Sequence, residues 1–219
     1  MKQLLTAVIP VRAGSQRVKQ KSLRKFNQKS LLFHKIEKLK KIKSIDNIVV
    51  NTDSQEAINI AKKLKVNYWK REKYYASSAC SNSEFWQHIG KTTNTFYIMF
   101  TNCTSPMLEV RDYVKIINKF YKIKNSYDSL NTVTEVREFL CLRNKPINFN
   151  INTTPNSQNL PDVVKLNFAV NILPRTTMIK RKNVIGSRPY FYKIDEIKGF
   201  DIDTLNDFRY AEMLHKKLF

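Results

Sequence analysis

Short strand-forming runs alternate with helical segments along the chain, and this rhythm limits the fold more than any other feature. Five runs rich in aliphatic, aromatic or β-branched residues predict strands at 4–10, 47–52, 66–69, 95–101 and 129–133. Apolar residues at helical spacing follow most of them, at 31–43, 57–64, 82–91 and 109–124. Strands that alternate with helices favour an α/β fold whose sheet is mostly parallel and covered on both faces.

The carboxyl-terminal part resumes this pattern. Further strands are expected at 167–172, 189–193 and 199–203. Thr204, with Asp207 three residues later, predicts a capped final helix that runs through Leu218. Asp53 and Glu56 carry the same signal, so we expect Asp53 to cap the helix after the second strand.

Residues 136–166 interrupt the rhythm. This stretch contains INFNINTTPNSQNLPD, which is dense in Asn, Thr, Pro and Ser. It is expected to be a disordered loop, an arm that reaches a partner subunit, or a lid over a site. We see no repeat and no clean domain boundary, so 1–219 is interpreted as one domain with this appendage.

The chain is strongly basic, with a formal net charge of +21 and 39 Lys and Arg residues. Such a balance fits a polyanionic partner: nucleic acid, an anionic membrane, or a phosphorylated substrate. The lysines are spread along the chain, which favours compositional drift plus a small anionic substrate over a nucleic-acid surface. No apolar run reaches the ~18 residues of a membrane span. The three cysteines form no C-x-x-C pair and no signal peptide is evident, so a cytoplasmic location is expected.

Polar groups follow several predicted strands, and in open α/β sheets ligands bind at that edge. The first such segment is IPVRAGSQRVKQKS, residues 9–22, where Arg12 and Lys21 flank the small residues 13–15. Small residues let the backbone N–H groups approach a phosphate while the cations neutralise its charge. Alone, a basic loop is equally well explained as a solvated loop, because neither a G-x-x-x-x-G-K-[ST] nor a G-x-G-x-x-G pattern is present.

Two further strand ends add to this edge. Asp201 and Asp203 are two residues apart, so a strand would place both carboxylates on one face. There they could hold Mg²⁺, which favours one or two carboxylates with substrate phosphate oxygens. TNCTSP, residues 101–106, contributes hydroxyl, amide and backbone groups. Together the three segments indicate a nucleotide-using transferase.

Residues 9–22 resemble the signature loop of the acylneuraminate cytidylyltransferase family, the CMP-sialic acid synthetases and their relatives. TNCTSP is similar to that family's Q-P-T-S-P, residues 158–172 to its Q-x-L-P…N-G-A-I-Y-I, and residues 201–204 to its D-I-D-T. Residues 50–53, VNTD, resemble the end of its second strand. The resemblance implies a three-layer α/β/α sandwich with a small dimerisation arm.

The resemblance also implies an activity. Members of the family transfer CMP from CTP to a sugar acid, such as sialic acid or a related nonulosonic acid, and release pyrophosphate with Mg²⁺ as cofactor. The products serve surface glycan biosynthesis. The expected partners are therefore CTP, an acidic sugar and a second copy of the chain, without a membrane and without nucleic acid.

Roles carry over only where residues match. Arg12, Lys21, Asp201 and Asp203 are expected to be catalytic, with both aspartates as metal ligands. The expected nucleotide-binding residues are Arg12, Ala13, Gly14, Ser15, Lys21, Ser22, Arg71, Ser81, Asn82 and Asn102. The expected substrate-binding residues are Thr104, Gln158, Lys165 and Asn167.

Several positions depart from the family's pattern: Gln16, Ser22, Asn102, Cys103, Leu108, Ser157 and Phe168. The nucleotide loop and the aspartate pair are largely kept, whereas acceptor-side positions differ. A different acceptor, a 3-deoxy sugar acid or a phosphonate, therefore stays open. The alternative of another class is a basic nucleic-acid-binding protein without catalysis, which accounts for the charge but not for the two kept motifs.

Overall fold

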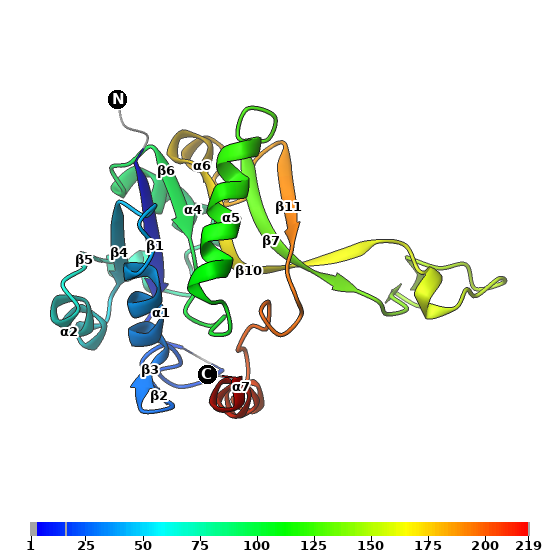
Figure 1. Ribbon diagram of the computed structural model, residues 1–219, viewed down its shortest axis with the longest axis horizontal. Coiled ribbons are helices and arrows are strands. Elements are labelled where there is room, and N and C mark those ends of the chain that lie inside the picture. Colours follow the sequence, from blue (N-terminus) through cyan, green and yellow to red (C-terminus); the bar gives the residue numbers. More distant parts are fainter. Residues whose placement is uncertain (1–3, 16, 219) are drawn as a thin grey trace.

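Seven strands form the central sheet in the computed structural model, which describes residues 4–15 and 17–218 (Figure 1). Their spatial order is β11-β7-β10-β6-β1-β4-β5. The strands are β1 (Leu5–Val11), β4 (Asn47–Thr52), β5 (Asn67–Lys70), β6 (Tyr97–Phe100), β7 (Ser129–Val136), β10 (Val163–Pro174) and β11 (Pro189–Lys193). Neighbouring strands run parallel except where β10 pairs antiparallel with β6 and β7. The expected mostly parallel α/β sheet is confirmed.

Helices cover both faces because side chains alternate along each buried strand. In β1, Ala7 and Ile9 face one hydrophobic cluster and Val8 faces the other. Helices α1 (Leu31–Lys40), α2 (Gln55–Lys63), α5 (Val110–Ile123) and α7 (Leu205–Leu218) contribute to the first cluster. Helices α4 (Asn82–Thr92) and α6 (Arg175–Arg181) contribute to the second. The three-layer arrangement follows from this alternation.

The long connections of the sheet contain smaller elements. A two-stranded hairpin, β2 (Lys25–Phe26) with β3 (Lys29–Ser30), precedes α1, and a one-turn helix α3 (Lys73–Ala76) precedes α4. The sequence pattern predicts neither of them, nor α6. Among the described helices, none combines the length and apolar character needed to cross a membrane.

Two predictions about local structure are wrong. Ser54, not Asp53, caps α2: its hydroxyl accepts from the Ala57 amide at 3.3 Å. Residues 199–203 form a turn and a loop, not a strand. The amide of Ile202 donates to the Thr104 carbonyl at 2.9 Å and its carbonyl accepts from Lys21, so the backbone bonds a loop and a side chain instead of a strand ladder. The predicted cap of α7 is confirmed, since Asp207 N–H donates to Thr204 Oγ1 at 3.1 Å.

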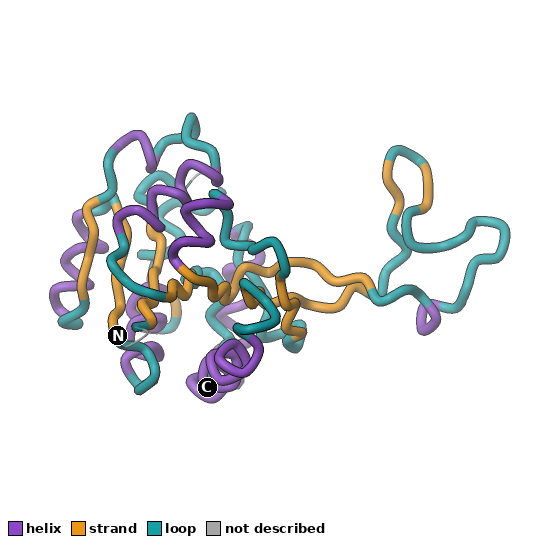
Figure 2. The backbone as a smooth tube through the Cα atoms, turned by 90° about the horizontal axis from the view of Figure 1, so that it is seen from above, coloured by secondary structure: helices purple, strands orange, loops and turns teal. Residues whose placement is uncertain are grey.

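The segment expected to be an arm leaves the body between β7 and β10. Both strands continue beyond the sheet, and the chain between them extends far from the core (Figures 1 and 2). It contains the hairpin strands β8 (Cys141–Leu142) and β9 (Lys145–Pro146) and a 3-10 turn η1 (Ser157–Asn159). Its side chains Phe139, Leu142, Ile147 and Ile151 are exposed. The segment is thus extended and contains short elements, and its role as an arm that reaches a partner or as a lid stays a prediction.

Candidate active site

The carboxyl ends of β1 and β4 meet at one edge of the sheet and are joined there. The amide of Ala13, just beyond β1, donates to Asp53 Oδ1 at 2.9 Å, just beyond β4. Ala13 and Gly14 are exposed, and a Cβ placed on Gly14 would meet no described atom within 4 Å. The loop therefore presents open backbone at the position where the sequence predicts a phosphate. Gln16, one of the departures from the family pattern, lies outside the described residues.

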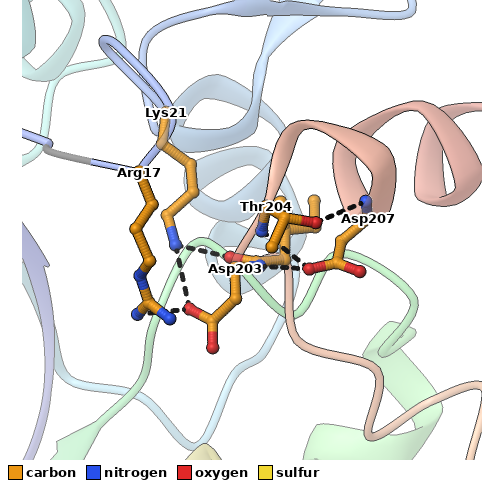
Figure 3. A network of polar contacts seen from close by, with 6 residues as sticks. Arg17, Lys21, Asp203, Thr204 and Asp207 are labelled. Atoms are coloured by element: carbon orange, nitrogen blue, oxygen red, sulfur yellow. Dashed lines mark hydrogen bonds and ion pairs between the residues drawn. The ribbon is translucent and has the colours of Figure 1, made fainter.

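Lys21 connects this loop to the D-I-D-T segment. Its Nζ donates to the Ile202 carbonyl at 2.5 Å and lies 3.4 Å from Asp203 Oδ1. Arg17 contacts the same carboxylate oxygen at 2.7 Å (Figure 3). The Lys21 side chain is 13% exposed and that of Arg17 66%. The two ends of the chain that carry the most specific motifs thus meet through a half-buried ion pair.

The start of α7 holds Asp203 in place from the other side. The Asp203 amide donates to Asp207 Oδ2 at 3.0 Å, and the Thr204 amide donates to the same oxygen at 2.7 Å (Figure 3). These bonds and the Thr204 hydroxyl form the N-terminal cap of α7. The Asp203 backbone is therefore fixed by the helix, while its side chain is turned toward Arg17 and Lys21.

Asp201 lies in a less polar environment than Asp203. Burial raises the pKa of its carboxyl, and the charge of Asp203 acts in the same direction, while a hydrogen bond with Thr104 and the nearby Lys21 oppose the shift. Its Oδ1 is buried and has no hydrogen-bond partner among the described residues. A buried, unpartnered carboxylate oxygen near a second carboxylate fits a hard cation such as Mg²⁺, which takes oxygen ligands.

Arg71 directly follows β5 and is bonded to the end of the neighbouring strand β4. Its Nε donates to Asn51 Oδ1 at 2.6 Å, a terminal NH₂ donates to the Asn51 carbonyl at 2.8 Å, and the guanidinium lies 4.3 Å from the centroid of the Phe85 ring. Burial lowers its pKa to about 10; Asp53 opposes the shift and Arg12 adds to it. The charges of Arg71 and Arg12 therefore influence each other, and a nucleotide-binding role for the two arginines stays a prediction.

Ser81 and Asn82 form the start of α4, beside Arg71. Ser81 is the N-cap, and a capping box joins it to Glu84 in both directions. Tyr74 OH donates to Glu84 Oε1 at 2.7 Å, and bonds from Ser81 and Tyr74 lower the pKa of Glu84 to about 2. The Ser81 hydroxyl is thus engaged in the cap, whereas Asn82 is exposed.

A buried lysine of α1 is hydrogen-bonded to the loop that follows β6. Lys35 of α1 is 3% exposed, and its Nζ donates to Thr101 Oγ1 at 3.4 Å, to the Ser105 carbonyl at 3.3 Å and to Tyr113 OH. Complete burial raises the pKa of Cys103 to about 12, while a hydrogen bond with Ser22 acts against the shift. This contact places Ser22 against the loop of Asn102 and Thr104.

Four residues are expected to bind the acceptor; Thr104 lies in the loop after β6, and the other three lie at separate places. Asn167 is 6% exposed; its Oδ1 accepts from Thr132 Oγ1 at 2.7 Å, and its Nδ2 has no partner among the described residues. Lys165 is exposed and lines a cavity of about 700 Å³ at the base of the arm. Gln158 lies in η1, out on the arm, so within one chain it does not reach the loop.

Sequence reasoning missed part of the network. It did not give Arg17 a role, although the basic loop contains it, and it interpreted Asp53 as a helix cap instead of the acceptor for Ala13. Lys35 and Thr132 carried no signal, because their roles depend on contacts across 66 and 35 positions of the chain.

Comparison with known proteins identifies the family of the chain. The cytidylyltransferase family model matches residues 6–219. The chain is 26% identical to the post-translational flagellin modification protein B of Campylobacter coli, covering 97% of this chain and 95% of that one. It is 24% identical to the CMP-N,N'-diacetyllegionaminic acid synthase of Campylobacter jejuni, covering 96% and 94%. It is 25% identical to the N-acylneuraminate cytidylyltransferase of Escherichia coli, covering 99% of this chain but 53% of that one.

Solved structures share the fold. A CMP:2-keto-3-deoxy-manno-octonic acid synthetase complexed with CTP superposes with a TM-score of 0.71 at 13% identity, over 99% of this chain and 100% of the other. A 4-diphosphocytidyl-2C-methyl-D-erythritol synthase from Anaerococcus prevotii has the same TM-score at 11% identity, over 98% and 99%. With the family model matching nearly its whole length, the chain belongs to the cytidylyltransferase family, whose members are CTP-dependent nucleotidyltransferases.

Proposed function

We propose that this protein transfers CMP from CTP to a nonulosonic acid, with release of pyrophosphate, for surface glycan biosynthesis. The observation that carries the proposal is the Lys21 contact, which joins the phosphate-type loop to Asp203. The CMP-N,N'-diacetyllegionaminic acid synthase of Campylobacter jejuni, matched over nearly its full length, and the N-acylneuraminate cytidylyltransferase of Escherichia coli support a sugar acid of the legionaminic or sialic kind.

The mechanism follows from the chemistry of the chain's own groups. Arg12, Lys21 and the open loop backbone at Gly14 bind the triphosphate, and the two cations neutralise its charge. Asp201 and Asp203 would hold Mg²⁺, which would supply charge neutralisation for the triphosphate. An acceptor oxygen attacks the α-phosphorus in line and pyrophosphate leaves, so the protein contributes chiefly by positioning both reactants.

The nucleoside lies along Arg71, Ser81 and Asn82. Arg71 is fixed by its two bonds to Asn51 and by the Phe85 ring, so it can present a donor to the cytosine or ribose without reordering. On the other side of the reacting phosphorus, Thr104 and Asn167 face the acceptor.

We also propose that the protein is a homodimer. The arm exposes apolar side chains that one chain leaves uncovered, and in this extended conformation Gln158 could bind substrate only at a partner's site. Light scattering at micromolar concentration should give twice 25.8 kDa. A monomeric mass would contradict the homodimer, and the arm would then be interpreted as a lid over a site.

Pyrophosphate release tests the proposal. Purified protein is incubated with Mg²⁺, CTP and one acceptor at a time: N,N'-diacetyllegionaminic acid, N-acetylneuraminic acid, 2-keto-3-deoxy-manno-octonic acid and a phosphonate. Release with an N-acylated acid and CTP, but not with ATP or GTP, is expected. Release only with the phosphonate or the octonic acid would assign the alternative acceptors. Salt-sensitive binding to DNA without any release would instead indicate a nucleic-acid-binding protein.

A further inference from the structure

Lys35 lies on the buried face of α1, at a position where an apolar side chain would pack. Leu31 and Leu39, one turn before it and one turn after it, belong to the hydrophobic core, and Lys35 is buried between them. Taking an ammonium group out of water costs free energy unless hydrogen bonds replace its hydration. The partners of Lys35 therefore show what this buried charge is used for.

Three oxygens surround the Lys35 ammonium group. Its Nζ donates to Thr101 Oγ1 at 3.4 Å, to the Ser105 carbonyl at 3.3 Å and to Tyr113 OH. A lysine has three N–H donors, so this set satisfies all of them. Thr101 and Ser105 flank the turn that contains residues 102–104. Lys35 thus ties both ends of this turn to α1.

Thr104, within the turn, contacts the aspartate segment in two ways. Its carbonyl accepts from the Ile202 amide at 2.9 Å, and its side chain forms a hydrogen bond with Asp201. The carbonyl of Ile202 accepts from Lys21 on the other side. The position of Asp201 therefore depends on the turn, whereas the backbone of Asp203 is fixed by the cap of α7.

Other contacts hold the flanks of the turn without Lys35. Thr101 Oγ1 donates to the Ala169 carbonyl at 2.7 Å, in the bulge of β10 where its register with β7 shifts between Leu166 and Asn171. Lys38, the next lysine of α1, donates to the Pro106 carbonyl at 2.6 Å, just beyond the turn. Loss of the Lys35 bonds would therefore displace the turn, while the loop around it stays folded.

We propose that Lys35 is a positioning residue for the metal site: by tying both ends of the turn to α1, it fixes the place from which Thr104 orients the Asp201 carboxylate. The proposal rests on the proposed function, because it requires that Asp201 and Asp203 hold Mg²⁺. Groups that orient metal ligands from behind change metal affinity or activity by about 10- to 100-fold when they are removed.

Lys35→Met tests the proposal, because methionine is similar in length and removes all three donors. The melting temperature is measured with CTP at increasing Mg²⁺ and without acceptor, and pyrophosphate release is measured over the same Mg²⁺ range. The Mg²⁺ concentration that gives half of the full effect should rise by about tenfold in both measurements. Lys38→Met is the matched control: it removes the same kind of bond from the same helix, outside the turn, and it should keep the Mg²⁺ dependence of the wild type.

A purely structural role predicts a different result. It would lower the melting temperature of Lys35→Met without metal and leave the Mg²⁺ dependence unchanged, which would overturn the role of Lys35 alone. Equal shifts in Lys35→Met and Lys38→Met would overturn it as well. If Lys35→Met does not fold, Thr104→Val removes the bond to Asp201 directly, and an unchanged Mg²⁺ dependence in that variant would contradict the proposal. A wild type that responds to Mg²⁺ neither in melting nor in turnover would overturn the proposed metal site and this inference together.

Discussion

The proposed nucleotide side and the proposed acceptor side of the candidate site are built from different chemistry. On the nucleotide side, charged groups gather at the ends of parallel strands: Arg12, Lys21, Arg71, Asp53 and Asp203. On the acceptor side, neutral groups around the bulge of β10 bond one another: Asn131 Nδ2 donates to Asn171 Oδ1 at 2.8 Å, and Thr132 donates to Asn167. Charged side chains bind the triphosphate of any nucleotide, because every nucleoside triphosphate carries the same negative charges. Buried amide groups and aromatic rings instead distinguish ligands by their shape.

This contrast predicts that variants on the two sides will have different effects on turnover. Removing a charge on the nucleotide side should reduce turnover with every acceptor equally. A neutral change around the bulge should alter which acceptor is used. Variants on each side therefore separate the two functions, and variants that affect both would show that the sides are not independent.

The largest effect is expected from the aspartate pair. Asp201→Asn and Asp203→Asn should each reduce the rate on the order of 10²-fold or more, because each removes a carboxylate that would hold Mg²⁺. Rates at saturating CTP, with Mg²⁺ titrated, check this. Asp162→Asn is the control, an exposed carboxylate that pairs with Lys193 at the base of the arm. Near-normal turnover in both variants would remove the metal site.

The same two variants should differ in stability. Burial raises the pKa of Asp201, so its ionised form opposes folding, and this cost develops as pH rises from 3.8 through the higher folded pKa. Asp201→Asn should therefore melt at the wild-type temperature or above it at pH 7. Asp203→Asn loses contacts with Arg17 and Lys21, and it should melt slightly lower.

Lys21→Met should have the next largest effect. Lys21 bonds both the Ile202 carbonyl and Asp203, so its loss separates the loop from the D-I-D-T segment. We expect kcat/KM for CTP to fall by about 10- to 10²-fold, at ~1.4 kcal/mol per tenfold for a charged hydrogen bond. Lys19→Met, an exposed lysine of the same loop, is the control. A loss confined to one acceptor would contradict the proposed division of the site.

Arg71→Lys tests recognition of the nucleoside. A lysine cannot keep both bonds to Asn51 together with the stack on Phe85. The KM for CTP should rise about tenfold, equivalent to ~1.4 kcal/mol, while the KM for the acceptor stays the same. Arg24→Lys is the matched control, since Arg24 lies 5.5 Å from the Phe208 ring and has no place in the site. Equal shifts in both variants would argue against a nucleoside contact.

The same contrast explains how far the sequence could be interpreted. The proposed nucleotide side is predictable because its motifs are contiguous: residues 9–22 contain the end of β1 and the loop after it, and residues 201–204 precede α7. Strand alternation and helical spacing give the bounds of β4 and β11 correctly. Both depend on neighbours in sequence, which a single chain displays directly.

The acceptor side could not be predicted in this way. Asn131 and Asn171 lie 40 positions apart, and only the pairing of β7 with β10 brings them together. The wrong prediction of a strand at 199–203 has the same cause. A pattern of apolar residues cannot show that Lys21, 181 positions away, donates a hydrogen bond to the Ile202 carbonyl. Gly199 adds a further tertiary constraint, because a Cβ there would lie 2.4 Å from Thr134 Cγ2.

The smallest expected effect is a loss of stability at acid pH. His215 of α7 faces His34 of α1 at 5.3 Å between ring centroids, with Asn27 Nδ2 at 3.2 Å from its Nδ1. Burial lowers the pKa of His215 to about 4, with Lys38 and His34 acting in the same direction, and it also lowers the pKa of His34. The unfolded chain therefore binds more protons between pH 6.5 and about 4.

The contribution of neutral His215 to the stability of the fold is fully present above pH 6.5 and is lost as the pH falls toward 4. Because α7 begins at the cap that fixes Asp203, acid should weaken CTP-induced stabilisation before it disturbs the bulge of β10. His215→Gln keeps an acceptor for Asn27 without titrating, so its melting temperature should fall less than that of the wild type between pH 7.5 and 4.5. Parallel melting curves across this range would show that His215 does not couple α7 to pH, and the nucleotide side would then have no acid-sensitive support from this helix.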